Sequence, residues 1–213
     1  MTLSLVFAMT NPERVLGLVL RGGFLAEQKE LRDYLDGVYN GRFPGSWERF
    51  IAQIPADARH NPTEHYLLQM TSADEKVRRH FAYEWTYFET SRLHLRQKPE
   101  LDIIRSILED KGRADKKRDY LSGAILEAYY FQNLCFFPED QWIMKNIHRV
   151  PRVPTTIIHG VYDDVCPVQN SIRLHDALSW SKLLLVQAGH SRSDPAIQHA
   201  LVNETDAMVS KLM

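Results

Sequence analysis

The chain has 213 residues, of which 44% are hydrophobic and 25% charged, and its formal net charge is −1. This composition predicts a soluble globular chain with a sizeable core, and the mixing of basic with acidic residues excludes a polyanion-binding surface. No apolar run approaches the ~20 residues of a membrane span, and two cysteines, Cys135 and Cys166, are too few for a disulfide framework, which favours a cytoplasmic location.

The first expected elements are a helix and a strand. Residues 2–9 are apolar almost all round, which is typical of a helix buried inside a larger protein, and they lack the basic lead-in of a signal peptide. Asn11-Pro12 ends this helix. Residues 15–20 (VLGLVL) are a continuous apolar run, the pattern of a parallel strand covered on both faces, and Gly22-Gly23 ends it.

A long helical segment separates this strand from the next one. From about Phe24 to Val150 the sequence is charged and rich in aromatic residues at helical spacing, and no stretch of it resembles a buried strand. In residues 109–119, nine of eleven residues are charged, which predicts a solvated helix end or a loop.

The last part of the chain alternates between strands and helices. We expect buried strands at residues 155–159 and 183–186, and helices at residues 168–178 and 195–212. The predicted fold class is therefore α/β: residues 1–24 and 151–213 form part of a doubly wound parallel sheet with flanking helices. Residues 25–150 form an all-helical cap domain inserted into it.

Two polar residues follow the two C-terminal strands. Asp163 follows the first and His190 the second, so we expect both side chains to be exposed at one edge of the sheet. An acid and a base in this order are the second and third members of the Ser-Asp-His triad of the α/β-hydrolase fold. A single Asp more often closes a turn or caps a helix, as Asp164 could also do, and a single loop histidine is more often just exposed. The pair favours the catalytic interpretation.

Other kinds of site have little support. The chain contains no H-E-x-x-H motif, no C-x-x-C pair and no glycine-rich phosphate loop, so we expect no metal and no nucleotide. Cys166 lies three residues beyond Asp163 without an adjacent histidine, and we interpret it as a wall residue and not as a nucleophile.

Four segments together resemble one family. They are N-P-E-R-V-L-G-L-V-L-R-G (11–22), I-L-E-A-Y-Y-F (125–131), H-G-V-Y-D-D-V-C-P (159–167) and A-G-H-S (188–191). They resemble the proline iminopeptidases (prolyl aminopeptidases), serine peptidases of the α/β-hydrolase superfamily, from about Thr2 to the C-terminus. The resemblance implies the C-terminal part of an α/β-hydrolase fold, with Asp163 as the triad acid and His190 as the base. The family's nucleophilic serine lies in a G-G-S-W-G elbow, which would precede Met1.

The resemblance also implies a substrate, a small peptide with a free N-terminal proline. Its ammonium group would be held by Glu89 and Glu127 of the cap, since a cation in a water-poor pocket needs compensating charge. The flat apolar wall that a pyrrolidine ring prefers would come from Trp85, Phe88, Tyr130 and Phe131. Without the resemblance, the glutamates would be solvated helix residues and the aromatic side chains the core of the cap.

Departures from the family pattern leave alternatives open. Val161 stands where the family usually has arginine, Phe88 replaces a tryptophan, and the elbow is absent from the chain. The chain could therefore be a non-catalytic remnant or binding module, or an esterase or amidase with another substrate, although paired glutamates argue against neutral substrates. No nucleic acid, membrane, metal or organic cofactor is expected, because acyl transfer by a triad needs none. The oligomeric state is not determined by the sequence.

Overall fold

The computed structural model describes residues 1–38, 42–96, 98–108 and 120–213, which fall into two compact units. We call Met1–Glu30, Leu93–Leu95 and Phe137–Met213 the sheet unit, and Leu31–Arg92 with Arg96–Phe136 the helical unit. The sequence placed residues 25–30 and 137–150 in the cap. In the structure they lie in the sheet unit, because Leu25, Ile143 and Val150 are part of its hydrophobic core.

The sheet unit contains three parallel strands in the order β1-β2-β3. They are β1 (Leu18–Arg21), β2 (Thr155–Gly160) and β3 (Lys182–Val186). Ile157 of β2 lies opposite Leu20 of β1 on one side and opposite Leu183 of β3 on the other. The strands are flanked by α1 (Thr2–Thr10), α8 (Trp142–Lys145), α9 (Val168–Ala177) and α10 (Pro195–Leu212).

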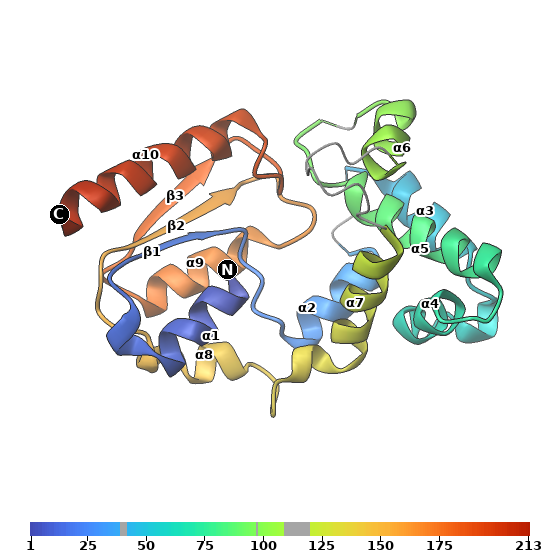
Figure 1. Ribbon diagram of the computed structural model, residues 1–213, viewed down its shortest axis with the longest axis horizontal. Helices are drawn as coiled ribbons and strands as arrows, with labels where there is room; N and C mark the ends of the chain where they lie inside the picture. Colours follow the sequence, from blue (N-terminus) through green and yellow to red (C-terminus); the bar gives the residue numbers. More distant parts are fainter. Residues whose placement is uncertain (39–41, 97, 109–119) are drawn as a thin grey trace. The chain divides into compact units, whose positions relative to one another are not determined.

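The flanking helices cover both faces of the sheet. Figure 1 shows α10 along one face and α1, α8 and α9 along the other. Every residue of β2 is buried, as expected of a parallel strand covered on both sides. The expected fold class, a parallel sheet with flanking helices as in the C-terminal part of an α/β-hydrolase, is confirmed.

Two expectations about burial were wrong. β3 is not a buried strand: Leu185 is 44% exposed, because β3 lies at an edge of the described sheet. α1 is buried on one face only, through Leu5, Ala8 and Met9. The expectation of burial all round came from the apolar composition of the helix, but the sheet unit covers a single side of it.

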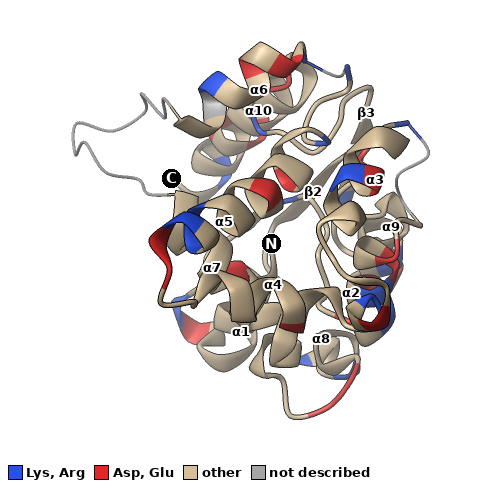
Figure 2. Cartoon of the chain, turned by 90° about the vertical axis from the view of Figure 1, so that its right-hand side faces the viewer, with Lys and Arg blue, Asp and Glu red and all other residues tan. Residues whose placement is uncertain are grey.

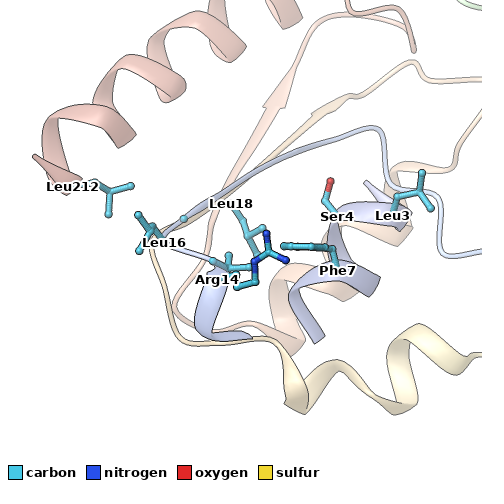
Figure 3. A pocket seen from close by; sticks show the side chains of 9 residues that line it. Leu3, Ser4, Phe7, Arg14, Leu16, Leu18 and Leu212 are labelled. Atoms are coloured by element: carbon cyan, nitrogen blue, oxygen red, sulfur yellow. The ribbon is translucent and has the colours of Figure 1, made fainter. Parts of the chain in front are cut away.

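The uncovered side of α1 borders an open hollow of about 700 Å³. Leu3 and Phe7 line it from α1, Leu16 and Leu18 from the start of β1, and Leu212 from the end of α10 (Figure 3). The hollow lies beside the first residue of β1, whereas Asp163 and His190 follow the last residues of β2 and β3. It is therefore separate from the candidate catalytic residues.

The helical unit contains no strand among its described residues. α2 (Gln28–Leu35) starts in the sheet unit and continues into the helical one. The other helices are α3 (Pro44–Ala52), α4 (Pro62–Met70), α5 (Glu75–Thr90), α6 (Glu100–Leu108) and α7 (Tyr120–Gln132). Short 3-10 turns occupy Pro12–Arg14, Ala56–Ala58, Leu134–Phe136 and Ile147–Arg149. The charged segment 109–119 lies outside the described residues.

Side-chain caps begin two of these helices. Asn61 accepts a hydrogen bond from the backbone of Glu64 at the start of α4, and Asp74 accepts one from Lys76 at the start of α5. Basic and acidic residues are intermixed along the helices (Figure 2). None of the described helices is both long and apolar enough to cross a membrane.

Candidate active site

Asp163 and His190 lie together beyond the carboxyl ends of β2 and β3. His190 Nδ1 donates a hydrogen bond of 2.8 Å to Asp163 Oδ2. The structure thus brings together the two residues that the sequence paired. The expected exposure of the acid was wrong, because the side chain of Asp163 is only 1% exposed and that of His190 17%.

The two loops meet because Gly160 has no side chain. A Cβ atom at Gly160 would lie 2.1 Å from the carbonyl oxygen of Gly189 and 2.4 Å from that of Ala188. Backbone hydrogen bonds join the same loops, from Val161 N to Val186 O and from Tyr162 N to Ala188 O. Any larger residue at position 160 would push the Asp163 loop away from the His190 loop.

The carboxylate of Asp163 has hydrogen-bond donors on both oxygens. Oδ1 accepts from the backbone N–H groups of Val165 and Cys166, at 2.8 Å each. Asp163 therefore also closes a turn, the alternative role that the sequence left open. Burial alone would raise the pKa of Asp163, but hydrogen bonds from His159 and His190 hold it well below its ordinary value. The carboxylate is ionised, the state in which it can orient a histidine.

The backbone of the His190 loop is held by three hydrogen bonds. Arg21 donates to the carbonyl of His190, Ser191 N donates to Leu93 O at 2.7 Å, and Gly189 N donates to Asp194 Oδ2 at 2.7 Å. Gly22, at φ +58°, lies against the ring, since a Cβ there would be 3.0 Å from His190 Cε1. These contacts fix the position from which the imidazole meets Asp163.

Gly189 is needed for close packing and not for a turn with positive φ. A Cβ at this position would lie 2.7 Å from the backbone of His94 and Leu95. The same segment is held by Asp194, whose Oδ1 accepts from His94 Nδ1 at 2.7 Å and whose Oδ2 accepts from Leu95 N at 3.3 Å. Sequence reasoning missed Asp194 and His94, because 100 residues separate them.

The two glutamates of the helical unit also lie together. Glu127 is on α7 and Glu89 on α5. Trp85 Nε1 donates a hydrogen bond of 2.7 Å to Glu127 Oε2. Removal of the Glu127 carboxyl from water raises its pKa, and the charge of Glu89 and a hydrogen bond with it raise the pKa further. Because two carboxyl groups can share a hydrogen bond only with a proton between them, this pair is a proton-holding acidic site.

The predicted aromatic wall is only partly assembled at this pair. The ring of Phe131 lies 6.1 Å from that of Trp85. Phe88 is buried and stacks on Phe50 at 4.3 Å, so it is a core residue of the helical unit. Tyr130 is 42% exposed and packs edge-on against Phe136.

A buried arginine that the sequence did not single out lies next to this group. The side chain of Arg92 is fully buried, with its guanidinium 3.7 Å from the centre of the Phe88 ring. Its charge lowers the pKa of Glu127 and so opposes the effect of Glu89. A buried cation is the reason two carboxyl groups can be tolerated here.

Comparison with known proteins shows the family. No protein-family profile matches the chain. It is 36% identical over 213 residues to a probable proline iminopeptidase of Leptolyngbya boryana, covering 99% of this chain and 63% of that protein. It is 36% identical over 211 residues to a proline iminopeptidase of Xylella fastidiosa (98% of this chain, 64% of that protein). It is 33% identical over 213 residues to one of Neisseria gonorrhoeae (100% and 64%).

The chain belongs to the proline iminopeptidase family. It spans somewhat less than two thirds of the length of these relatives.

Cys166 lies close to the acid of this proline iminopeptidase chain but is not suited to be a nucleophile. Burial raises the pKa of its thiol well above the ordinary value, and the charge of Asp163 raises it further. Both cysteines are free. Among the residues that the structure describes, no three His, Cys, Asp or Glu side chains are grouped as a metal site would require.

Proposed function

We propose that the chain supplies the acid, the base and the ammonium anchor of a serine aminopeptidase that releases proline from the N-terminus of peptides. The observation that carries the proposal is the hydrogen bond from His190 to a buried, ionised Asp163. The names of the relatives support the choice of reaction and substrate. In this proposal the nucleophilic serine comes from an elbow that precedes Met1.

The chemistry follows from the order of the hydrogen bonds. The serine hydroxyl would add to the carbonyl carbon of the N-terminal proline while His190 Nε2 takes the hydroxyl proton. Asp163, bonded to Nδ1, keeps Nε2 free as the acceptor and stabilises the imidazolium. His190 then returns the proton to the leaving amine. Water, activated by the same histidine, hydrolyses the acyl-enzyme and releases proline.

The acidic pair explains why a free amino terminus would be required. A prolyl ammonium that approaches Glu89 and Glu127 would favour loss of the shared proton, because a cation nearby stabilises the ionised form of a carboxyl group. An N-acetylated proline carries no charge and would leave the desolvated carboxyls without a partner. Such a site rejects blocked peptides by the cost of those unpaired groups.

The first experiment concerns the nucleophile. Reading the coding DNA upstream of Met1 in the same frame should reveal a G-G-S-W-G elbow. An in-frame stop codon before any such elbow would sink the enzymatic proposal and favour the non-catalytic alternative for this polypeptide.

The second experiment concerns the substrate. In the form that contains the elbow, prolyl-naphthylamide should be hydrolysed and N-acetylprolyl-naphthylamide should not. Equal turnover of the two compounds would contradict the role of Glu89 and Glu127, and it would favour an esterase or amidase of different specificity. His190→Ala should abolish turnover while the far-ultraviolet circular dichroism spectrum stays unchanged.

A further inference from the structure

A second histidine contacts the carboxylate of Asp163, at the same oxygen as His190. His159 is in β2, and its side chain is completely buried. Its Nε2 lies 3.2 Å from Asp163 Oδ2, the same oxygen that accepts from His190, and 3.1 Å from the carbonyl oxygen of Cys166. The motif at residues 159–167 begins with this residue, but the sequence did not single it out.

The hydrogen bonds of the His159 ring define where its proton is. The backbone N–H of Gly23 points at Nδ1 at 3.1 Å, so Nδ1 must offer a lone pair. The hydroxyl of Ser171, 2.6 Å away, then shares this single lone pair as a second donor. Nε2 faces two oxygens that can only accept, so Nε2 carries the hydrogen. The ring is therefore a neutral donor.

We propose that His159 is a positioning residue of the triad, a neutral hydrogen-bond donor that holds Asp163 Oδ2 from within the core while the more exposed His190 binds the same oxygen. This role rests on the proposed function, because positioning Asp163 matters for catalysis only if His190 acts as the base. The hydrogen bond itself does not depend on that function.

The neutrality of the donor is what suits it to this position. A buried carboxylate needs donors because no water reaches it. A lysine or arginine would satisfy Asp163 but would also pair with its charge, which would compete with the imidazolium that forms on His190 during the reaction. A neutral imidazole N–H donates a hydrogen bond to Asp163 Oδ2 and leaves the negative charge of the carboxylate to pair with His190.

Three segments of the sheet unit converge to fix this ring. Gly23 follows β1, Ser171 is in α9, and the Asp163 loop follows β2. Gly23 lies so close that a Cβ there would be 2.7 Å from the Ser171 hydroxyl. Ser171 is itself fully buried, so both partners of Nδ1 are held in place. The imidazole therefore has one tautomer and one orientation available.

The test uses the full chain with ¹⁵N-labelled histidine and two matched variants. In His159→Gln the side-chain amide can place an N–H where Nε2–H was. In His159→Asn the shorter side chain reaches only the Nδ1 position and leaves Asp163 without this donor. Long-range ¹H–¹⁵N correlation spectra report the ring tautomers, and the Nδ1–H proton of His190 reports the strength of its hydrogen bond to Asp163. Circular dichroism checks the fold of each variant.

We expect His159 of the unsubstituted chain to be neutral with its hydrogen on Nε2. In His159→Asn the His190 Nδ1–H resonance should move downfield, because Oδ2 loses a competing donor and accepts more strongly from the one that remains. In His159→Gln it should stay near its original position. In the form with the elbow, His159→Asn should lower kcat about tenfold, the effect of one lost hydrogen bond to a charged group, with little change in KM.

Two results would overturn the inference. One is an His159 ring in the unsubstituted chain that is charged or carries its hydrogen on Nδ1 alone, a measurement that stands even if a variant does not fold. The other is an identical His190 resonance in both variants, which is the behaviour of a residue that only fills space. Expected spectra together with no turnover of prolyl substrates would overturn the proposed function and leave the hydrogen bond established.

Discussion

The carboxylate of Asp163 stays ionised without access to water, because four N–H groups surround it. Two come from the backbone of the turn that it closes and two from histidine rings. Hydrogen bonds to the charged form lower a carboxyl pKa even where burial raises it. The single residue thus shapes its loop and orients His190 with different oxygens.

Asp163→Asn should separate the role of this side chain in closing its turn from its role in orienting His190. The amide can still accept from the backbone at one end, but it presents an N–H₂ group or a weaker acceptor to His190 and favours the wrong tautomer of the ring. In the form that contains the nucleophile, we expect kcat to fall by roughly 10³ to 10⁴. Steady-state kinetics with prolyl-naphthylamide would measure it. Asp176→Asn, at an exposed position of α9, is the matched control and should change kcat less than about twofold. Activity close to normal in Asp163→Asn would remove this residue from the triad.

Glu127→Gln should affect binding more than chemistry. The substitution removes a carboxyl group that would ionise when the prolyl ammonium binds, and it retains an acceptor for Trp85. We expect KM for prolyl-naphthylamide to rise roughly tenfold to a hundredfold with little change in kcat, since a charge pair is lost. Glu48→Gln, exposed on α3, should leave KM unaltered. A KM in Glu127→Gln equal to that of the control would argue that the acidic pair is only structural.

The sequence predicted that the side chains of Asp163 and His190 lie together, but it did not predict the hydrogen bonds that their loops form. Asp163 and His190 were paired because parallel strands end at one edge of a sheet, a rule that needs no side-chain detail. The contributions of His159 and Asp194 depend on backbone N–H groups of Gly23 and Gly189, whose directions are set by loop conformation. Residue types along the chain carry little information about those directions.

The loops that follow β2 and β3 are held together because their backbones pack directly against each other. The approach of Gly160 to the carbonyls of Ala188 and Gly189 leaves no room for a methyl group. A catalytic histidine and its acid can be held rigidly in loops only when such contacts fix the loops on the sheet. The glycine is therefore part of the site even though it has no chemistry of its own.

Gly160→Ala should destabilise the chain by about 1–3 kcal/mol, the usual cost of forcing extra atoms into a packed site. Urea unfolding followed by circular dichroism would measure this cost. Gly123→Ala is the matched control, because a Cβ there has no atom within 4 Å. Since Gly123 lies within α7, alanine should stabilise that helix by up to about 1 kcal/mol. Equal stability of the two variants would contradict the packing argument for Gly160.

The order of the elements followed from sequence, whereas the partners of some elements did not. The helices at 168–178 and 195–212 and the strand at 155–159 were placed within a residue or so of α9, α10 and β2. The region around α8 reads as helical in the sequence and could not be assigned to one core or the other. Its core residue Ile143 packs with α1 and the sheet, a matter of tertiary contacts.

Across the whole molecule, buried carboxyl groups make the stability depend on pH in opposite directions. Burial raises the pKa of Glu30, in the sheet unit, to about 8, and that of Glu127, in the helical unit, to about 8 as well. Asp163 is shifted the other way. A folded-state pKa above the unfolded one favours folding while the group is protonated, and a folded-state pKa below it favours folding while the group is ionised.

Stability should therefore be greatest at mildly acidic pH. The contribution of Glu30 is present below its unfolded pKa of 4.5 and is lost as the pH rises towards about 8, by up to about 5 kcal/mol in total. The contribution of Asp163 is present above about pH 4 and is lost as the pH falls further. Urea unfolding at several pH values would measure the loss of stability on both sides of the optimum. Glu30→Gln should reduce the loss of stability between pH 5 and pH 8, with the remainder coming from Glu127, and Glu13→Gln, exposed between α1 and β1, should not change it. If Glu30→Gln left the loss of stability between pH 5 and pH 8 unchanged, that loss would have to come from another group.

The small segment Leu93–Leu95 affects the design of chimeras between related chains. The chain passes between the two units four times, at residues 30/31, 92/93, 95/96 and 136/137. A chimera that transplanted everything from 31 to 136 as one block would also replace the carbonyl of Leu93 that holds Ser191 and the stretch of backbone against which Gly189 packs. Grafts made as two separate pieces, with the native tripeptide left between them, keep the histidine loop anchored while the helical unit is redesigned.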